Sequence, residues 1–252
     1  MVSGGARLLW AALLALALIP ARGEVIRVAV ASNFQAPAKV IAERFEAQSG
    51  HQVKLTVGAT GKHYAQIVNG APFAAFLAAD RHRPQRLEEA GIALPGSRFT
   101  YALGRLALWS PRADMVDTRG EVLARGGFTR LAIANPRLAP YGQAAREVLE
   151  ARGLWQSLAP RMVRGENIGQ TFQFIDSGNA ELGFVAYSQI RPPHAPAEGS
   201  HWEVPAALHS PIAQQAVLLR DTPAARGFLD YLRGEQAARI IRDHGYRLPG
   251  GD

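Results

Sequence analysis

The feature of this sequence that most constrains its fold is an alternation of short apolar runs with segments of helical periodicity. Residues 26–31 form an apolar run rich in valine, which is typical of a strand buried on both faces. Apolar residues then recur at helical spacing over residues 38–45, and Gly50 is expected to end that helix. Strands that alternate with helices favour a mostly parallel sheet covered by helices on both faces.

The same alternation continues along the chain. Further strands are predicted at residues 53–57, 73–80, 104–110, 131–134, 182–187 and 215–220, and helices at residues 62–68, 142–151, 167–176 and 222–244. Thr222 is expected to cap the last helical segment, with Pro223 at its first position. Two alternating halves followed by a helical segment predict two α/β lobes.

Residues 1–23 have the pattern of a secretory signal peptide. One basic residue precedes an apolar run, residues 8–19, which is too short to span a bilayer and is followed by small residues. We expect the mature chain to begin near Glu24. The alternative, an uncleaved membrane anchor, is disfavoured because the run lacks the length and the stop-transfer flank of a spanning helix.

Cysteine content and charge exclude several classes of protein. The sequence has no cysteine, which excludes disulfides, thiolate metal sites, a cysteine nucleophile and lipidation at a cysteine after the signal. The formal net charge is +7, but the arginines are scattered along the chain and no basic run is interleaved with aromatic residues. This pattern predicts a solvated surface rather than a nucleic-acid-binding face.

Four predicted strand-to-helix loops share polar or small residues. They are Ser32-Asn33 and residues 58–61, 140–142 and 166–168. The start of a helix exposes free N–H groups and the positive end of its dipole, which together favour an anion. Any one of these loops is most simply an ordinary helix cap. Four of them at the carboxyl ends of strands, where α/β sheets bind ligands, predict a shared anion site.

The sequence gives little support for a phosphate-binding P-loop, a metal site or a catalytic site. The stretch GATGKH at residues 58–63 is too short for a phosphate-binding P-loop, and neither GxSxG nor HExxH occurs. The spacing of His194, His201 and His209 matches no zinc pattern. Asp80 follows a predicted strand, where a carboxylate that braces a loop is a more frequent finding than a catalytic acid. We therefore expect a binding protein rather than an enzyme, with no metal site and no cofactor.

Several longer segments, taken together and in order, carry a resemblance to a known family. They are VAVASNFQAPAKVIAERFEAQSGHQV, GATGKHYAQIVNGAP, FLAAD, IANPRLAPYGQAAREVLE, GENIGQTFQFIDSGNAELGFVAYSQI and FLDYLRGEQAARIIRDHGY. The chain resembles the periplasmic molybdate-binding proteins of ABC transporters over essentially all of the expected mature sequence.

The resemblance implies a type II periplasmic-binding-protein fold, in which two crossover strands join two α/β lobes. Lobe one would comprise residues 24–103 and 215–252, and lobe two residues 104–214, with crossovers near residues 101–108 and 214–219. It further implies a periplasmic monomer without a lipid anchor, which captures molybdate or tungstate and delivers it to an ABC permease.

The family's ligand contacts fall on five residues of this chain: Ser32, Asn33, Thr60, Tyr141 and Ile168. Ile168 is expected to act only through its backbone N–H, and Asn33 through its backbone N–H with its side-chain amide as a further candidate. Many members have a tyrosine at the position of Ala186 and an alanine at that of Tyr141. We expect Tyr141 to supply the phenolic donor; Tyr187 is the competing candidate, although a shift of one residue along a strand turns it to the opposite face.

Three alternatives stay open at this point. The same fold could serve another tetrahedral oxyanion, such as sulfate or phosphate. It could also be a sensing module of a regulator or receptor kinase, which the signal peptide and the lack of an attached helix-turn-helix or membrane span disfavour. A secreted hydrolase using Ser32 or Asp80 is the third alternative.

Overall fold

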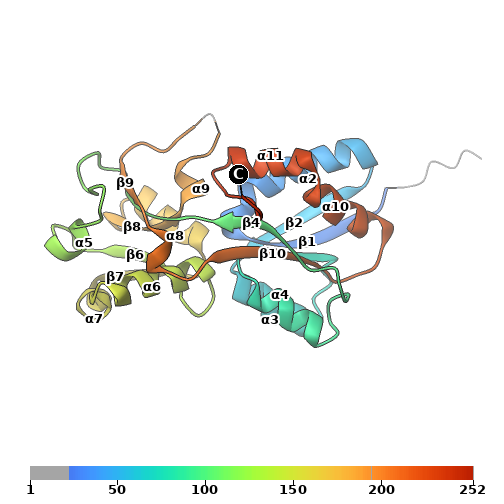
Figure 1. Ribbon diagram of the computed structural model, residues 1–252, viewed down its shortest axis with the longest axis horizontal. Helices are drawn as coiled ribbons and strands as arrows, with labels where there is room; N and C mark the ends of the chain where they lie inside the picture. Colours follow the sequence, from blue (N-terminus) through green and yellow to red (C-terminus); the bar gives the residue numbers. More distant parts are fainter. Residues whose placement is uncertain (1–22, 194, 252) are drawn as a thin grey trace, which may run out of the picture.

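Two five-stranded sheets organise this protein, each within its own lobe (Figure 1). The computed structural model describes residues 23–193 and 195–251, so residues 1–22 of the expected signal peptide lie outside the described residues. No helix within the described ranges has the length and apolar character needed to cross a membrane.

Lobe one contains the sheet with strand order β2-β1-β3-β10-β4. Its strands are β1 (Val25–Ala31), β2 (Gln52–Gly58), β3 (Ala75–Ala78), β4 (Phe99–Gly104) and β10 (Ile212–Leu218). Its helices are α2 (Gln35–Ser49), α3 (Thr60–Val68), α4 (His82–Glu89), α10 (Pro223–Arg233) and α11 (Glu235–Asp243). Helices α2, α10 and α11 cover one face of the sheet, and α3 and α4 cover the other (Figure 1).

Lobe two repeats this plan with strand order β7-β6-β8-β5-β9. Its strands are β5 (Leu106–Ser110), β6 (Leu131–Ala134), β7 (Met162–Gly165), β8 (Leu182–Ala186) and β9 (Ser200–Glu203). Its helices are α5 (Val122–Arg125), α6 (Pro140–Ala151), α7 (Trp155–Leu158), α8 (Ile168–Asp176) and α9 (Tyr187–Ile190). Short 3₁₀ turns complete the described chain: η1 (Ser32–Phe34), η2 (Ala159–Arg161) and η3 (Ala206–Leu208).

Each sheet is mostly parallel, as the alternation of strands and helices predicted. Strand β1 pairs in parallel with β2 and β3, and β6 with β7 and β8. The one reversed strand in each sheet is β10 in lobe one and β5 in lobe two, each antiparallel to both of its neighbours. These are the strands that directly follow a passage of the chain between the lobes. The expected two-lobed α/β fold is therefore confirmed.

The chain passes between the lobes at Arg105 and again at residues 209–211. The first passage lies within the predicted crossover. The second lies earlier than the predicted one, because residues 212–214 already pair with β4: Ile212 lies opposite Gly104, and Gln214 opposite Ala102. The boundary between lobe two and the returning chain is thus near residue 211 rather than 214.

The expected cap of the C-terminal helices is present. The hydroxyl of Thr222 accepts a hydrogen bond from the N–H of Ala225 at 3.3 Å, and Pro223 is the first residue of α10. We predict that Thr222→Ala lowers the free energy of unfolding by about 1 kcal/mol, because one helical N–H loses its acceptor. Urea denaturation measures this loss. Thr222→Ser retains the hydroxyl and should stay close to the parent; an equal loss in both variants would contradict a capping role.

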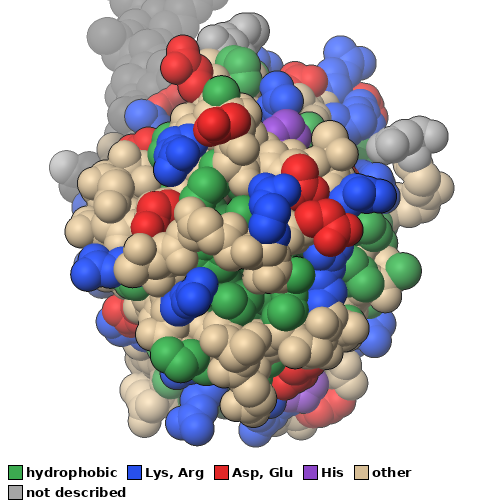
Figure 2. Space-filling model, turned by 90° about the vertical axis from the view of Figure 1, so that its left-hand side faces the viewer, with side chains coloured by type: hydrophobic (Ala, Val, Ile, Leu, Met, Phe, Trp, Pro, Cys, Tyr) green, Lys and Arg blue, Asp and Glu red, His purple; other side chains and the backbone are tan. Residues whose placement is uncertain are grey.

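The surface of lobe two carries charges of both signs. In the face drawn in Figure 2, Lys and Arg side chains alternate with Asp and Glu side chains, and hydrophobic side chains lie among them. Exposed pairs such as Arg146–Glu150 and Arg119–Glu121 belong to this lobe. A face of mixed sign fits the interpretation that the net charge of +7 is spread over the surface.

Candidate functional site

Four helical segments begin around one small cavity between the lobes. Turn η1 follows β1, α3 follows β2, α6 follows β6, and α8 follows β7, so each segment starts at the carboxyl end of a parallel strand. All five predicted site residues line this cavity: Ser32, Asn33, Thr60, Tyr141 and Ile168. The structure thus brings together residues from four separate loops, as expected for ligand sites in α/β sheets.

The cavity is suited to a compact ligand. Its volume is about 10 Å³, and small residues such as Ala59 and Ala139 form part of its wall. Pockets for drug-sized molecules usually measure at least about 300 Å³. The size of the cavity therefore favours a small ion over a sugar or a peptide.

Direct contacts between the lobes close the cavity on two sides. The N–H of Gly61 donates to the carbonyl of Leu138 at 2.8 Å, and the N–H of Gly169 donates to the hydroxyl of Ser32 at 3.2 Å. A Cβ atom on Gly61 would lie 3.1 Å from both Cα and O of Leu138, which is tighter than an ordinary contact. Glycine at this position therefore allows the two lobes to approach closely.

Two hydroxyl groups from lobe one line the cavity with their protons free to donate. The Thr60 hydroxyl oxygen accepts from the N–H of Ala79 at 3.1 Å, and its side chain is almost fully buried at the start of α3. The Ser32 oxygen accepts from Gly169 as described. Because each oxygen already accepts a hydrogen bond, each O–H remains available as a donor. Helix α3 begins two residues earlier than predicted, so Thr60 belongs to its first turn.

The side-chain amide of Asn33 is hydrogen-bonded within the protein. It donates to Oε1 of Gln214 at 2.8 Å and to the hydroxyl of Tyr246 at 3.1 Å. Both amide protons have protein acceptors in this structure, so the amide would have to leave one of these partners to donate to a ligand, and its candidate role as a ligand donor stays a prediction. The side chain joins η1 to the interior of lobe one, and the backbone N–H stays the predicted contact.

The structure distinguishes the two tyrosines considered as phenolic donors. Tyr141 lies in the first turn of α6, is 1% exposed, and lines the cavity. Tyr187 begins α9, and its ring lies 3.9 Å from the guanidinium carbon of Arg105. Burial raises the pKa of Tyr141 well above its usual value, so the phenol keeps its proton at neutral pH. Tyr141, and not Tyr187, is among the residues that line the cavity, and its role as phenolic donor stays a prediction.

Ile168 is the first residue of α8, and its N–H has no acceptor within the helix. Asn167 caps this helix through its side-chain oxygen, which accepts from the N–H of Gln170 at 3.0 Å. The Ile168 side chain is buried in the core of lobe two. This arrangement fixes the direction of the first helical N–H without any polar side chain at residue 168.

The residues that line the cavity are uncharged. Asp80, considered above as an acid, accepts from the N–H of Arg83 at 2.9 Å and pairs with the guanidinium of the same residue. It therefore braces the start of α4. Lys62 and Glu166 form an exposed ion pair of 2.7 Å across the lobes. The cavity itself offers hydrogen-bond donors and helix N-termini rather than charged side chains.

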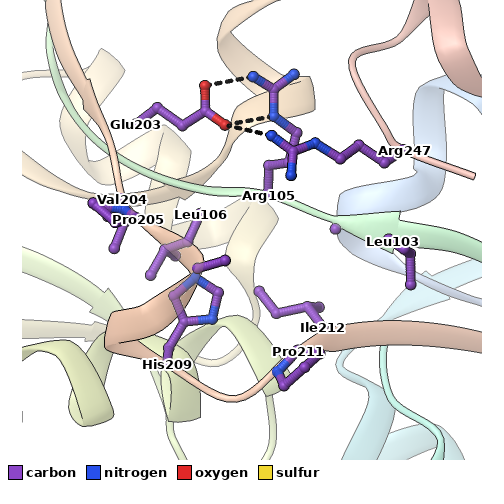
Figure 3. A pocket seen from close by; sticks show the side chains of 12 residues that line it. Leu103, Arg105, Leu106, Glu203, Val204, Pro205, His209, Pro211, Ile212 and Arg247 are labelled. Carbon is purple, nitrogen blue, oxygen red and sulfur yellow. Dashed lines mark hydrogen bonds and ion pairs between the residues drawn. The ribbon is translucent and has the colours of Figure 1, made fainter. Parts of the chain in front are cut away.

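A second, larger pocket lies where the chain passes between the lobes (Figure 3). Its volume is about 430 Å³, and apolar residues of both passages form much of its wall. Arg105 donates through Nε to Glu203 at 2.7 Å, pairs with the same carboxylate through its terminal nitrogen, and donates to the carbonyl of Gly245. Arg247 lies 3.9 Å from Glu203. The carboxylate already neutralises much of this positive charge, so the pocket is a weaker anion site than its arginines suggest.

The ion pairs at this pocket predict a pH-dependent contribution to stability. Hydrogen bonding to Arg105 lowers the pKa of the Glu203 carboxyl below its usual value. A lowered folded-state pKa gives stability that is complete above the unfolded pKa and is lost as the pH falls through the folded value. We expect Glu203→Gln to lower the melting temperature at pH 7 and to approach the parent as the pH falls through the lowered folded-state pKa of Glu203. Thermal melts across this range test the prediction; a difference that does not change with pH would contradict it.

A family model for bacterial extracellular solute-binding proteins matches residues 26–247. The chain belongs to this family. Two relatives are similar over nearly the whole chain. The molybdate-binding protein ModA of Azotobacter vinelandii is 49% identical over 231 residues, covering 90% of this chain and 92% of that protein. ModA of Rhodobacter capsulatus is 46% identical over 239 residues, covering 94% of this chain and 93% of that protein.

The fold of this solute-binding protein agrees with a solved relative. The periplasmic molybdate-binding protein of Azotobacter vinelandii superposes with a TM-score of 0.86 at 44% identity, covering 89% of this chain and 99% of that structure. The resemblance inferred from the sequence segments is confirmed, and these relatives are named as binding proteins rather than enzymes.

Proposed function

We propose that this protein is a periplasmic receptor that captures molybdate between its two lobes and passes it to an ABC permease. The observation that carries the proposal is the meeting of four helical starts and neutral hydrogen-bond donors at one small cavity. The similarity to proteins named for molybdate binding supports the choice of ligand.

Neutral donors suffice to hold an anion here. An unpaired buried ion costs several kcal/mol even after the protein relaxes. Each hydrogen bond to a charged group contributes about 1.5–3 kcal/mol of stabilisation, and a helix N-terminus contributes about 0.3–2 kcal/mol. The proposed donors are the hydroxyls of Ser32, Thr60 and Tyr141 and the first N–H groups of η1 and α8. Together they offset the cost without a lysine or arginine.

A cavity with donors favours one protonation state of the ligand. A fully deprotonated oxyanion accepts hydrogen bonds at every oxygen, whereas a protonated one presents an O–H that needs an acceptor. Molybdate and tungstate are nearly equal in size and charge, so both should bind. The smaller sulfate should make fewer of these contacts at once.

Closure of the lobes connects ligand binding to transport. Donors of lobe one and lobe two face the same cavity, so the anion stabilises the closed arrangement over an open one. Closure forms a surface from both lobes that a permease can distinguish from the open receptor. The proposed partner is an ABC permease, and the protein acts as a monomer without a cofactor.

Isothermal titration calorimetry with molybdate, tungstate, sulfate and phosphate tests this proposal. We expect one-to-one binding of molybdate and tungstate and much weaker heats for the other two anions. Tight binding of sulfate or phosphate with none of molybdate would retain the oxyanion receptor but overturn the named ligand. Absence of binding by all four anions would overturn the proposal.

A further inference from the structure

Gln214 lies behind the cavity and is completely buried. It belongs to β10, the strand that returns from lobe two to lobe one, and its side chain contacts residues of three other segments. Oε1 of Gln214 accepts from Nδ2 of Asn33 at 2.8 Å, and the hydroxyl of Tyr101 lies 3.1 Å from both this oxygen and the carbonyl oxygen of Ala78, so its one proton is shared between two acceptors. Its Nε2 lies 3.4 Å from the hydroxyl oxygen of Tyr141.

The direction of these hydrogen bonds is set by a backbone carbonyl. The carbonyl of Asn33 can only accept, and the hydroxyl of Tyr246 donates to it at 2.6 Å. The single proton of Tyr246 is thereby used, so its oxygen accepts from Nδ2 of Asn33 at 3.1 Å. The Asn33 amide nitrogen therefore faces both Tyr246 and Gln214, and the atom of Gln214 that meets it must be the oxygen.

These hydrogen bonds allow one orientation of the Gln214 side-chain amide toward Tyr141. With its oxygen turned to Asn33, its nitrogen faces the Tyr141 hydroxyl and donates to it. A reversed amide would place two donors against each other at Asn33. The Tyr141 oxygen is an acceptor in this contact, so its own proton is left for another acceptor, and Tyr141 is one of the residues that line the cavity.

Two further observations support this arrangement. A Cβ atom on Gly104 would lie 2.3 Å from the Tyr141 hydroxyl and 3.0 Å from Nε2 of Gln214, so the pair occupies space that only glycine leaves open. Burial raises the pKa of Tyr246 to about 12 and that of Tyr141 well above its usual value. Both phenols therefore carry one proton at neutral pH, as the assigned hydrogen-bond directions require.

We propose that Gln214 is a positioning residue that fixes Tyr141 as a hydrogen-bond donor toward the cavity. Through this contact the site selects ligands that present an acceptor at Tyr141, as a fully deprotonated oxyanion does. This inference deepens the proposed function and rests on it for the identity of the ligand. The state of the Tyr141 phenol in the free protein does not depend on that identity.

The first test is a double-mutant cycle between Gln214→Met and Tyr141→Phe, measured as molybdate affinity. Gln214→Met should weaken binding about tenfold, because Tyr141 loses the group that orders its proton. In the Tyr141→Phe background the same change should cost less than about twofold, since the hydroxyl on which Gln214 acts is absent. An equal loss in both backgrounds would overturn the proposal, because Gln214 would then act without Tyr141.

The matched control is Gln215→Met. Gln215 is the next residue of β10 and hydrogen-bonds Thr100 and Arg98, away from the cavity. Its substitution should leave the affinity within about twofold of the parent, as expected for a residue outside the network. A loss as large as that of Gln214→Met would indicate general damage to β10 and overturn the specific role of Gln214.

The second test needs no ligand. In protein labelled with ¹³Cζ-tyrosine, the signal of Tyr141 is identified by its loss in Tyr141→Phe. We expect this signal to shift in Gln214→Met and to stay in place in Gln215→Met. An unchanged Tyr141 signal in Gln214→Met would overturn the proposal. If the parent failed to bind molybdate but the signal shifted as expected, the proposed ligand would fail while the positioning role held.

Discussion

Gly61→Leu is expected to weaken molybdate binding by at least about 100-fold. The added side chain would enter the space between Gly61 and Leu138. In the parent, the N–H of Gly61 donates to the carbonyl of Leu138 across this space at 2.8 Å. Forced apart, the lobes could not present Tyr141 and Ile168 to an anion held by lobe one. Loss of two hydrogen bonds to a charged ligand, at about 1.5–3 kcal/mol each, corresponds to a factor of this size or larger. Calorimetry with molybdate measures the change.

Ala65→Leu is the matched control for this wedge. Ala65 is exposed and lies one turn after Gly61 on the same helix, α3, so the substitution adds a leucine at a position open to solvent. We expect near-parental affinity in this variant. Small-angle scattering with molybdate should also show Gly61→Leu more extended than the parent. Parental affinity in Gly61→Leu would contradict the role given to closure at this contact.

The second large effect is expected from Tyr141→Phe. The substitution removes one donor from a buried cavity while keeping the ring that packs in the core of lobe two. A hydrogen bond to a charged group contributes about 1.5–3 kcal/mol, so the affinity for molybdate should fall about 10- to 150-fold. The free energy of unfolding should change much less, because within residues 23–193 and 195–251 the phenol makes one long hydrogen bond, with Gln214.

Tyr187→Phe provides the comparison for Tyr141. The Tyr187 ring lies against Arg105, with the guanidinium carbon 3.9 Å from the ring centroid. This variant should bind molybdate as the parent does. If Tyr187→Phe lost affinity and Tyr141→Phe did not, the assignment of the phenolic donor would be reversed.

Most of the parallel strands could be predicted from the sequence because buried strands and amphipathic helices leave clear patterns. Strand β7, with the sequence MVRG, was missed, since only its last residue is buried. Helix α4 was missed, since its sequence HRPQRLEE buries only Pro84 and Leu87 and so lacks an apolar stripe. Strand β9, with the sequence SHWE, is a four-residue edge strand whose pairing with β5 is non-local. The second passage was placed late because nothing local shows that residues 212–214 pair with β4.

The candidate site was predictable to the extent that it depends on local chain features. Small and polar residues before helices mark free N–H groups, and the fold brings these starts together. The role of the Asn33 side chain was not predictable, because its partner Gln214 is 181 residues away and the direction of the bond depends on Tyr246. Gln214 itself carries no signal in the sequence that distinguishes it from Gln215, since only the pleat of β10 turns one of them toward the cavity.

The most direct test of this account is diffraction from crystals grown with molybdate, with data collected at the molybdenum absorption edge. The account predicts one strong anomalous peak between Ser32, Thr60, Tyr141 and Ile168, with the lobes closed around it. A peak in the pocket beside Arg105 and Arg247, with the cavity between the helix starts free of the anion, would contradict the account.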